Sequence, residues 1–417
     1  MANETTAGTR TAPHHLPPGA QAAAHYRRPL LHSPFFEASR PWIQTDSFIA
    51  WAGYLTPDVY SYVEQEYFAI RNSCALFDLT PMVKYCISGP DAERYLNRLM
   101  TGNMTKLAPN RVLYTLWCDD QGHVIDDGTV FRLGPQEFRV CCQDRQLDWF
   151  LDCAFGFDVQ VTEATADIAA LALQGPTAFA VLQAAGFLGL DTLAAMGIAQ
   201  QALQGIPVMV SRTGFTGDLG YELWVEPEHA AQLWNTLMQT GASRGITPMG
   251  YQALEMARIE AGFILPGADF MSCAQTLRLG RESTPWELNL DWTVALDKGH
   301  FNGRRALLAA RARGVRRKLV GLELDGNKPG HGALVYADAE NNIQIGEISS
   351  ALWSPTLKRN IAIARIDAPY CDSKATFWVD LYLHRELHWE RRNVRSWIVP
   401  RPFYAPARRR ALPPPLR

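Results

Sequence analysis

The sequence predicts an α+β protein of more than one domain, and three observations lead to this class. The chain has 417 residues, a length that usually divides into two or three packed units. Apolar residues make up 47% and charged residues 20%, the balance of a soluble globular protein rather than of a disordered one. Helical and strand patterns are mixed as far as about residue 315, after which short strands and turns dominate.

Three stretches of different character divide the chain. Residues 1–45 begin with a segment rich in Pro, Gly, Ala and Thr that lacks an apolar signal core, so we expect a loose N-terminal arm. Residues 46–300 carry both helical and strand patterns. Residues 315–410 are expected to form a separate β-rich domain.

The individual elements follow from periodicity and from turn residues. Residues 90–101 have Pro90 near their start and apolar side chains at helical spacing, which predicts an amphipathic helix. Residues 111–133 contain two apolar runs around an Asp-Asp-Gln-Gly segment, which predicts a β-hairpin. By the same criteria we predict helices near 145–155, 177–185, 228–243, 250–261 and 304–314, and strands near 138–143, 171–176, 206–211, 220–225 and 318–325.

Composition and motifs disfavour several classes of function. The formal net charge is −2, so the chain as a whole does not attract nucleic acids or anionic lipids, and no apolar run is long enough to predict a membrane span. Eight scattered cysteines suggest reduced thiols in a cytoplasm. Phosphate-loop, dinucleotide and nucleophile-elbow motifs are absent. His384 and His388 would lie roughly 13 Å apart on one strand face, so we expect no metal site.

Two adjacent carboxylates on the second hairpin strand are the first candidate site. Because side chains alternate along a strand, Asp126 and Asp127 must point to opposite faces. A buried carboxylate needs a partner or a ligand, since unpaired burial costs several kcal/mol. We expect Asp126 to face solvent near the turn and Asp127 to have a catalytic or ligand-binding role.

A second candidate lies in the segment from Ser211 to Val225. After Gly220, alternation places Glu222 and Trp224 on one face of the predicted strand. A carboxylate beside an aromatic ring suits a flat heterocycle with an amide edge, because the carboxylate accepts a pair of N–H groups and the ring provides stacking. A surface strand with an edge tryptophan fits this local pattern as well.

Nine segments follow one another along the chain: FDLTPM (77–82), VLYTLWCDDQGHVIDD (112–127), LQGP (173–176), SRTGFTGDLGYEL (211–223), ARIEAG (257–262), TPWELNLDWTV (284–294), FNGRRAL (301–307), GEISSALWSPTLKRNIAIA (346–364) and RPFY (401–404). In this order they resemble the glycine-cleavage T-protein family, which comprises tetrahydrofolate-dependent aminomethyltransferases and related demethylases. The similarity extends from about residue 47 to 410.

This resemblance implies a fold and a cofactor. Family members form a three-domain cloverleaf around a central channel that holds the folate. Residues 46–300 would then be the folate-binding region, built from two interleaved α+β domains, and residues 315–410 a barrel-like C-terminal domain. The implied cofactor is tetrahydrofolate, with no metal.

The resemblance also assigns roles to individual residues. Asp127 falls on the carboxylate that is treated as catalytic and hydrogen-bonds the folate near N10, and Glu222 falls on the residue that holds the pterin edge. The other residues expected to bind the cofactor are Phe215, Met82, Tyr114 and Arg410. Arg410 belongs to the basic run 408–410, for which a solvated tail is the alternative interpretation.

The sequence departs from the T-protein at several positions. Leu254 stands where the T-protein has an arginine, and Asn289-Leu290 replaces a Gly-Leu pair. The folate-cradling positions are kept, so the aminomethyl-lipoyl donor is more in question than the cofactor.

We therefore expect a cytoplasmic, tetrahydrofolate-dependent one-carbon transferase. Its donor would be a small molecule. An aromatic methoxy or methylenedioxy compound is one candidate, because Trp117, Trp286 and Trp353 lie in family segments that border the channel. We expect neither nucleic acid nor membrane as a partner. The alternatives are a glycine-cleavage aminomethyltransferase that acts on a lipoyl carrier protein, and a folate-binding module without catalysis.

Overall fold

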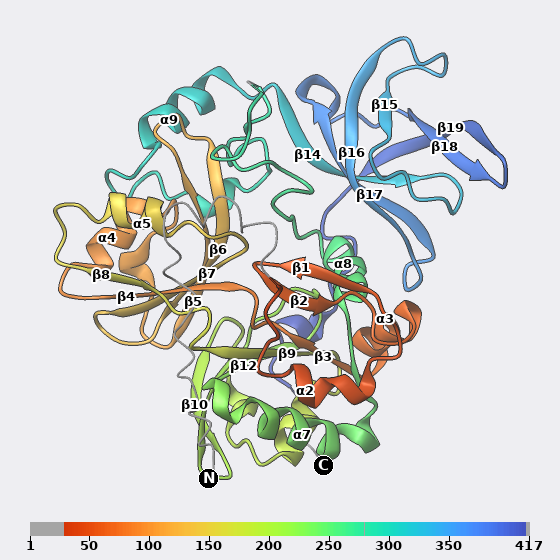
Figure 1. The fold of residues 1–417 in the computed structure, drawn as a ribbon. Coiled ribbons are helices and arrows are strands. Elements are labelled where there is room, and N and C mark those ends of the chain that lie inside the picture. The colour runs from red at the N-terminus through yellow and green to blue at the C-terminus, as the bar shows by residue number, and fades with distance from the viewer. Residues whose placement is uncertain (1–28, 279, 414–417) are drawn as a thin grey trace, which may run out of the picture.

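The computed structural model describes residues 29–278 and 280–413, which fold into three lobes that meet near the middle of the molecule (Figure 1). The expected N-terminal arm falls largely on residues 1–28, which lie outside the described residues. The chain first bonds to the rest of the protein at Leu31, whose N–H donates to the Gly53 carbonyl at 2.9 Å. The Phe35 ring is buried beside Trp234, and α2 (Phe36–Ser39) follows it.

The first lobe is an antiparallel sheet with the strand order β5-β6-β7-β4-β8. Helices α4 (Ala92–Leu99) and α5 (Leu147–Cys153) cover one face, where Tyr95 and Phe150 are buried. The predicted helix near 90–101 and the predicted hairpin are confirmed. The strands are β4 (Val83–Ser88), β5 (Arg111–Cys118), β6 (Val124–Arg132), β7 (Glu137–Cys142) and β8 (Gln160–Glu163).

The second lobe is a six-stranded sheet in the order β10-β11-β12-β9-β3-β13. One face packs on α6, α7 and α2 around Trp234, and the other packs on α3 and α8. Its strands flank the whole first lobe in sequence, since β3 precedes that lobe and β9 follows it. The elements are α3 (Val63–Asn72), β3 (Cys74–Asp78), β9 (Ala169–Gln174), α6 (Ala178–Ala184), β10 (Ile198–Leu203), β11 (Ile206–Ser211), β12 (Gly220–Val225), α7 (Ala230–Gly241), β13 (Ile246–Pro248) and α8 (Tyr251–Glu260), with a short hairpin β1 (Phe48–Trp51) and β2 (Tyr54–Pro57) beside them.

The two sheets face each other through one shared apolar cluster. Phe131 and Cys141 of the first sheet are buried with Met209 and Trp224 of the second. The Phe131 and Trp224 rings meet edge to face at a centroid distance of 5.2 Å. Because residues i and i+2 share a face, this contact fixes which side chains of β6 and β12 point into the space between the sheets.

The third lobe is a closed barrel, which confirms the expected β-rich C-terminal domain. Its strand order is β14-β17-β16-β15-β18-β19, and β19 pairs with β14 to close it. The apolar interior comes from alternate residues of each strand. Helix α9 (Arg304–Arg313) leads into β14 (Arg317–Leu324), followed by β15 (Leu334–Tyr336), β16 (Gln344–Ser354), β17 (Arg359–Asp367), β18 (Phe377–Arg385) and β19 (His388–Val399).

No described helix combines the length and apolar composition needed to cross a bilayer. All eight cysteines carry free thiols.

Candidate functional site

Each of the two facing sheets contributes one carboxylate to the space between them. Asp127 shares a face of β6 with Phe131, four residues later, and Glu222 shares a face of β12 with Trp224, two residues later. Since Phe131 and Trp224 are in contact, Asp127 and Glu222 lie on the facing sides of the two sheets. The sequence-based expectation for their faces agrees with this placement.

Asp127 is tied to Tyr114 on the neighbouring strand. The Tyr114 hydroxyl donates to Asp127 Oδ2 at 2.6 Å, and the Trp292 ring stacks on Tyr114 with centroids 5.7 Å apart. Burial raises the pKa of Asp127 to about 6, while the Tyr114 hydrogen bond acts in the opposite direction. A carboxyl group with this pKa exchanges protons near neutral pH, as a general base must.

Asp126 does not face solvent, so that expectation was wrong. Its side chain is buried on the helix-covered face of the sheet, where Gln146 Nε2 donates to Oδ2 at 2.8 Å and the Asp127 N–H donates to Oδ1 at 2.8 Å. Burial, and after it the charge of Asp127, hold the pKa of Asp126 well above its usual range. Asp126 is therefore a buried, hydrogen-bonded neighbour of Asp127 on the opposite face of the strand.

Glu222 is buried, and its hydrogen bonds within the described chain reach one of its two oxygens. Thr213 donates to Oε2 at 2.5 Å and Ser211 donates to the same oxygen at 3.5 Å. Within the described part of the chain, no hydrogen bond reaches Oε1. Burial raises the pKa of Glu222 to about 7. A ligand that presents N–H groups would supply the donors that the folded chain withholds.

This shifted pKa leads to a first prediction. Because the folded-state pKa of Glu222 lies above the unfolded value, the stability that this group contributes is complete below about pH 4.5 and is lost as the pH rises through about 7. We expect Glu222→Gln to match the wild type in stability at pH 4.5 and to exceed it by about 3 kcal/mol at pH 8. Urea unfolding of the ligand-free protein at the two pH values measures this difference.

Glu226→Gln is the matched control, because the Glu226 side chain is exposed and folding does not remove it from water. Its stability difference from the wild type should not change with pH. A pH-independent effect of Glu222→Gln would contradict the burial argument.

The loop after β11 carries Phe215 to the site. The Phe215 ring lies parallel to Phe263, with centroids 5.2 Å apart and planes 9° from one another. Gln174 holds the loop in place, accepting from Thr216 Oγ1 at 2.9 Å. A Cβ at Gly214 would lie 2.0 Å from the Gln174 side chain, so the loop can pack this closely only with glycine there.

Met82 is positioned by a buried lysine that sequence reasoning missed. Met82 packs against the apolar cluster shared by the sheets. The fully buried Lys84 donates to the Met82 carbonyl at 2.8 Å and to the Thr80 carbonyl at 2.7 Å. Burial lowers the pKa of Lys84 to about 8. From the sequence alone, a single lysine in a strand is expected to face solvent.

The basic run near the C-terminus is not a uniform solvated tail. Arg408 donates to Asp218 Oδ1 at 2.6 Å and to Oδ2 at 2.8 Å, and the Arg409 guanidinium lies 4.9 Å from the centre of the Phe263 ring. Arg410 itself is exposed. The structure thus places Arg409, rather than Arg410, against the Phe215–Phe263 aromatic pair.

The tryptophans expected near the channel behave differently from one another. Trp117 and Trp286 are core residues, and Trp353 is part of barrel strand β16. The sequence did not single out Trp292. In the structure its ring stacks on Tyr114, and 71% of its surface is exposed. It belongs to the segment 284–294, but no local pattern separates it from the other tryptophans.

A buried charged cluster lies behind Tyr114 and Asp127. Asp269 accepts from Arg258 Nη1 at 2.5 Å and from Ser350 at 2.8 Å, and its charge raises the pKa of Asp127. Arg401 Nη2 donates to the Leu319 carbonyl at 3.0 Å, whereas its Nη1 is buried without a partner. Among the charges that act on Tyr114, Arg401 is the one that lowers its pKa.

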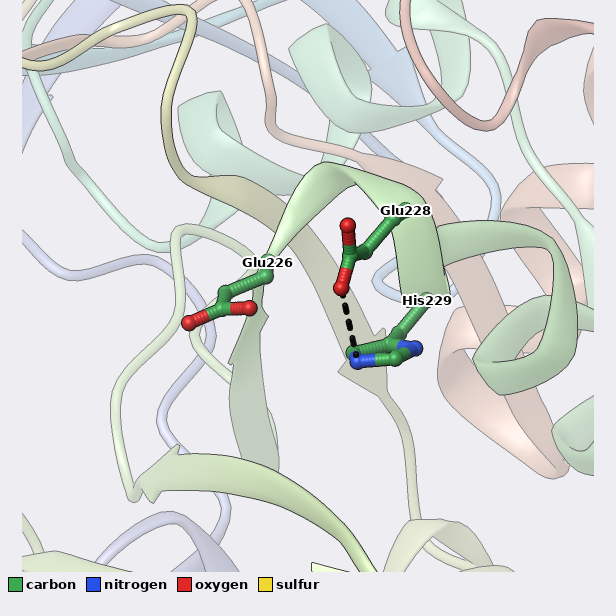
Figure 2. Close-up of side chains that lie close together, drawn as sticks. All are labelled: Glu226, Glu228 and His229. Carbon is green, nitrogen blue, oxygen red and sulfur yellow. Dashed lines mark ion pairs between the residues drawn. The ribbon is translucent and has the colours of Figure 1, made fainter.

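One surface group among the described residues has the spacing of a metal site. Glu226, Glu228 and His229 bring their ligand atoms within 4.8 Å of one another (Figure 2). Both glutamates are exposed, and Glu228 Oε1 lies 3.4 Å from His229 Nε2. The group follows the C-terminal end of β12, whereas Glu222 and Trp224 lie within this strand and face the space between the sheets. We therefore assign the group no role in the site.

Comparison with known proteins places this geometry in context. Residues 42–298 match the family described as the GCVT N-terminal domain, and residues 317–404 match the glycine cleavage T-protein C-terminal barrel domain. An aminomethyltransferase from Halothermothrix orenii is 35% identical over 323 residues, which cover 76% of this chain and 87% of that protein. A trimethylamine-oxide aldolase from Ruegeria pomeroyi is 35% identical over 384 residues, 88% of this chain but 46% of that longer protein.

A solved structure shares the whole architecture. The crystal structure of glycine cleavage system aminomethyltransferase T from Bartonella henselae aligns with a TM-score of 0.79 at 25% identity, covering 90% of this chain and 98% of that one. The three-lobed arrangement predicted from the sequence is therefore confirmed.

Proposed function

We propose a specific activity on the premise that this chain belongs to the glycine cleavage T-protein family of tetrahydrofolate-dependent one-carbon transferases. Membership of this family establishes that the chain is an enzyme and that tetrahydrofolate is its cofactor. Our proposal concerns the donor. We propose that it is a small methylated molecule, from which the enzyme transfers a one-carbon unit to tetrahydrofolate.

One observation carries this choice of donor. Leu254 occupies the position at which the T-protein has an arginine, and here it is buried in the apolar cluster between the sheets. At this position, the positively charged arginine of the T-protein is thus replaced by an apolar leucine. The relative named trimethylamine-oxide aldolase matches 88% of this chain, and its name specifies a small methylated compound.

The residues of the site fit tetrahydrofolate. Its pterin ring carries an amide N–H and an amino group on one edge, and the unsatisfied Oε1 and hydrogen-bonded Oε2 of Glu222 can accept both. Phe215, Phe263 and Met82 supply apolar walls. When bound, tetrahydrofolate provides the N5 nitrogen that accepts the one-carbon unit.

The protein's own part in the reaction is orientation and proton transfer. Glu222 fixes the pterin, so that the accepting nitrogen is held in one position. Asp127, with its pKa of about 6, takes up the proton that the accepting nitrogen releases. Tyr114 holds Asp127 by the 2.6 Å hydrogen bond, and Trp292 holds Tyr114 by stacking.

A thermal-shift titration with tetrahydrofolate under anaerobic conditions tests the site. At about 100 times its Kd, tetrahydrofolate should stabilise the wild type by about 2.7 kcal/mol. Glu222→Ala should lose most of this shift, whereas Glu226→Ala, whose side chain is exposed, should keep it. Equal shifts in wild type and Glu222→Ala would refute the assigned role of Glu222.

Mass spectrometry of the folate product then separates the donors. A methyl donor yields 5-methyl-tetrahydrofolate, and an aminomethyl or methylenedioxy donor yields the 5,10-methylene form. The second candidate is aminomethyl transfer from a lipoyl carrier protein, which the several relatives named aminomethyltransferase favour. Product formed only with a lipoylated carrier would establish that candidate in place of ours.

A further inference from the structure

We propose that a cavity between the first lobe and the barrel binds a small organic dianion, a phosphate monoester or a dicarboxylate. The cavity has a volume of about 460 Å³, within the usual range of small-molecule sites. Neither Asp127 nor Glu222 lines it. The proposal therefore concerns a second site, separate from the one assigned to one-carbon transfer.

Three parts of the chain form the walls of this cavity. His123 comes from the β5–β6 turn of the first lobe, Ser283 and Thr284 from the segment before α9, and Arg365 from barrel strand β17. Ser283 and Thr284 are buried, and the Ser283 carbonyl accepts from the Val124 N–H at 2.8 Å, at the start of β6. The cavity thus has a fixed floor that joins two lobes.

The connection from α9 to β14 brings further arginines to the cavity. Helix α9 ends at Arg313, and β14 of the barrel begins soon afterwards, at Arg317 (Figure 1). Gly314 makes the turn between them with φ 81° and ψ 165°, a conformation that residues with a side chain rarely adopt. As a result, Arg313, Arg316 and Arg317 all line the same cavity.

Most of these guanidinium groups have no carboxylate partner in the part of the chain that the structure describes. Arg313 and Arg316 are exposed, and their side chains form neither an ion pair nor a hydrogen bond with a described residue. Arg317 differs, since its Nε donates to Asp367 Oδ1 at 2.8 Å. A free guanidinium presents a planar set of N–H donors that matches a carboxylate or a phosphate.

Arg365 is the half-buried arginine of the cavity wall. Its Nη2 makes two long hydrogen bonds to neutral oxygens, at 3.3 Å to the Asp269 carbonyl and at 3.4 Å to Ser283 Oγ. Its Nε and Nη1 have no acceptor among the described residues. Burial lowers the pKa of Arg365, and the charges of Glu347 and Glu287 offset this only in part. A bound anion would supply the compensation that the folded chain lacks.

The two glutamates that line the cavity are already engaged by the backbone. Glu287 Oε2 accepts from the Thr284 N–H at 2.8 Å and from Thr284 Oγ1 at 3.0 Å. Glu282 Oε2 accepts from the Gly280 N–H at 2.6 Å, and hydrogen bonds from its own N–H and that of Gly280 lower its pKa. Positive charge therefore remains available. Four arginines against two glutamates leave an excess that a doubly charged ligand would balance.

Calorimetric titration at constant ionic strength tests the proposal. The dianionic probes are sn-glycerol 3-phosphate and succinate, and their neutral counterparts are glycerol and succinamide. We expect at least one dianion to bind the wild type about tenfold or more tightly than its neutral counterpart. The dianion that binds more tightly identifies the ligand as a phosphate monoester or a dicarboxylate. Equal affinity for both dianions and their neutral counterparts, or no binding of either dianion, would overturn the proposal.

Arginine variants locate the binding. Arg365→Gln should weaken dianion binding by about 10–100-fold, the usual range for a hydrogen bond to a charged group. Arg313→Gln changes an exposed side chain, so it should fold normally and weaken binding by about 2–5-fold. Arg305→Gln is the matched control, because Arg305 is an exposed residue of the same helix that does not line the cavity. Wild-type affinity in both Arg365→Gln and Arg313→Gln would refute the site.

A competition experiment separates this site from the cofactor site. Titration of the tighter-binding dianion should give the same affinity with and without saturating tetrahydrofolate, because the residues assigned to the pterin lie between the two sheets and do not line this cavity. Displacement of the dianion by tetrahydrofolate would make the cavity part of the cofactor site and overturn the proposal. Dianion binding that depends on Arg365 would support the proposal even if the one-carbon donor proved to be an aminomethyl carrier.

Discussion

Asp127→Asn is expected to lower kcat for folate product formation by about 10²–10⁴-fold, the usual contribution of a positioned general base. Asparagine has the same shape and can still accept the Tyr114 hydrogen bond, but it cannot take up a proton. Tetrahydrofolate binding should largely persist, because the substitution leaves Glu222, the proposed pterin-binding residue on the opposite sheet, unchanged. Steady-state kinetics with product detection by mass spectrometry measures the first effect, and the thermal shift with tetrahydrofolate measures the second.

The pH dependence of the wild type provides the second readout of the same role. Since Asp127 must be ionised to accept a proton, kcat should fall as the pH drops through about 6. Tyr114→Phe removes a hydrogen bond that favours the ionised form, so it should move this limb to higher pH.

Asp120→Asn is the control for this substitution, because Asp120 is an exposed residue in the turn of the same hairpin. It should retain wild-type kcat. Full turnover by Asp127→Asn would refute the role of Asp127 as base. Loss of turnover together with loss of tetrahydrofolate binding would instead assign Asp127 to cofactor binding alone.

The sequence was informative wherever alternation along one strand decided the outcome. The faces of Asp127 and Glu222 follow from the two-residue period of a strand, and the helices at 90–101 and 250–261 follow from apolar spacing. These are local properties, and the structure agrees with them.

Predictions of burial failed where burial depended on which element packs against a strand. Alternation correctly placed Asp126 opposite Asp127, but it could not reveal that α5 and its preceding residue Gln146 cover that face. Lys84 is buried for the same reason, since the second sheet covers it. Trp292 differs from Trp117 only in what packs around it, which depends on residues far away in the chain.

Hydrogen-bond partners that lie far apart in the sequence could not be predicted either. Arg71 on α3 and Glu260 on α8 are separated by 189 positions in sequence, yet they pair in the interior. Neither residue has a neighbour in sequence that indicates its partner. The pairing of α3 with α8 through these two side chains is therefore evident only from the fold.

Arg71→Leu is expected to lower the free energy of unfolding by about 3–5 kcal/mol, the usual cost of breaking a buried ion pair from one side. Arg71 donates to Glu260 Oε2 through Nε at 2.9 Å and through Nη2 at 2.6 Å, and both side chains are almost completely buried. Leucine fills part of the space but leaves the Glu260 carboxylate without its cation. Calorimetric unfolding of the ligand-free protein measures the loss.

Two further variants show whether the loss comes from the unpaired charge. Arg40→Leu breaks an exposed pair with Glu37 at 3.6 Å and should cost less than about 1 kcal/mol. The double variant Arg71→Leu/Glu260→Leu removes both charges and should recover a substantial part of the stability. If the double variant is as unstable as the sum of its single changes, packing rather than charge explains the effect.

The same substitution should also weaken tetrahydrofolate binding, because Arg71 ties the loop that carries Phe215 to α3. Its Nη1 donates at 2.9 Å to the carbonyl of Thr216, next to Phe215, and its guanidinium lies 4.4 Å from the centre of the Tyr404 ring. Without Arg71, the loop that presents Phe215 loses its hydrogen bond to α3. A smaller thermal shift with tetrahydrofolate is therefore expected in Arg71→Leu, and wild-type affinity in this variant would mean that Gln174 and the Arg408–Asp218 pair suffice to fix the loop.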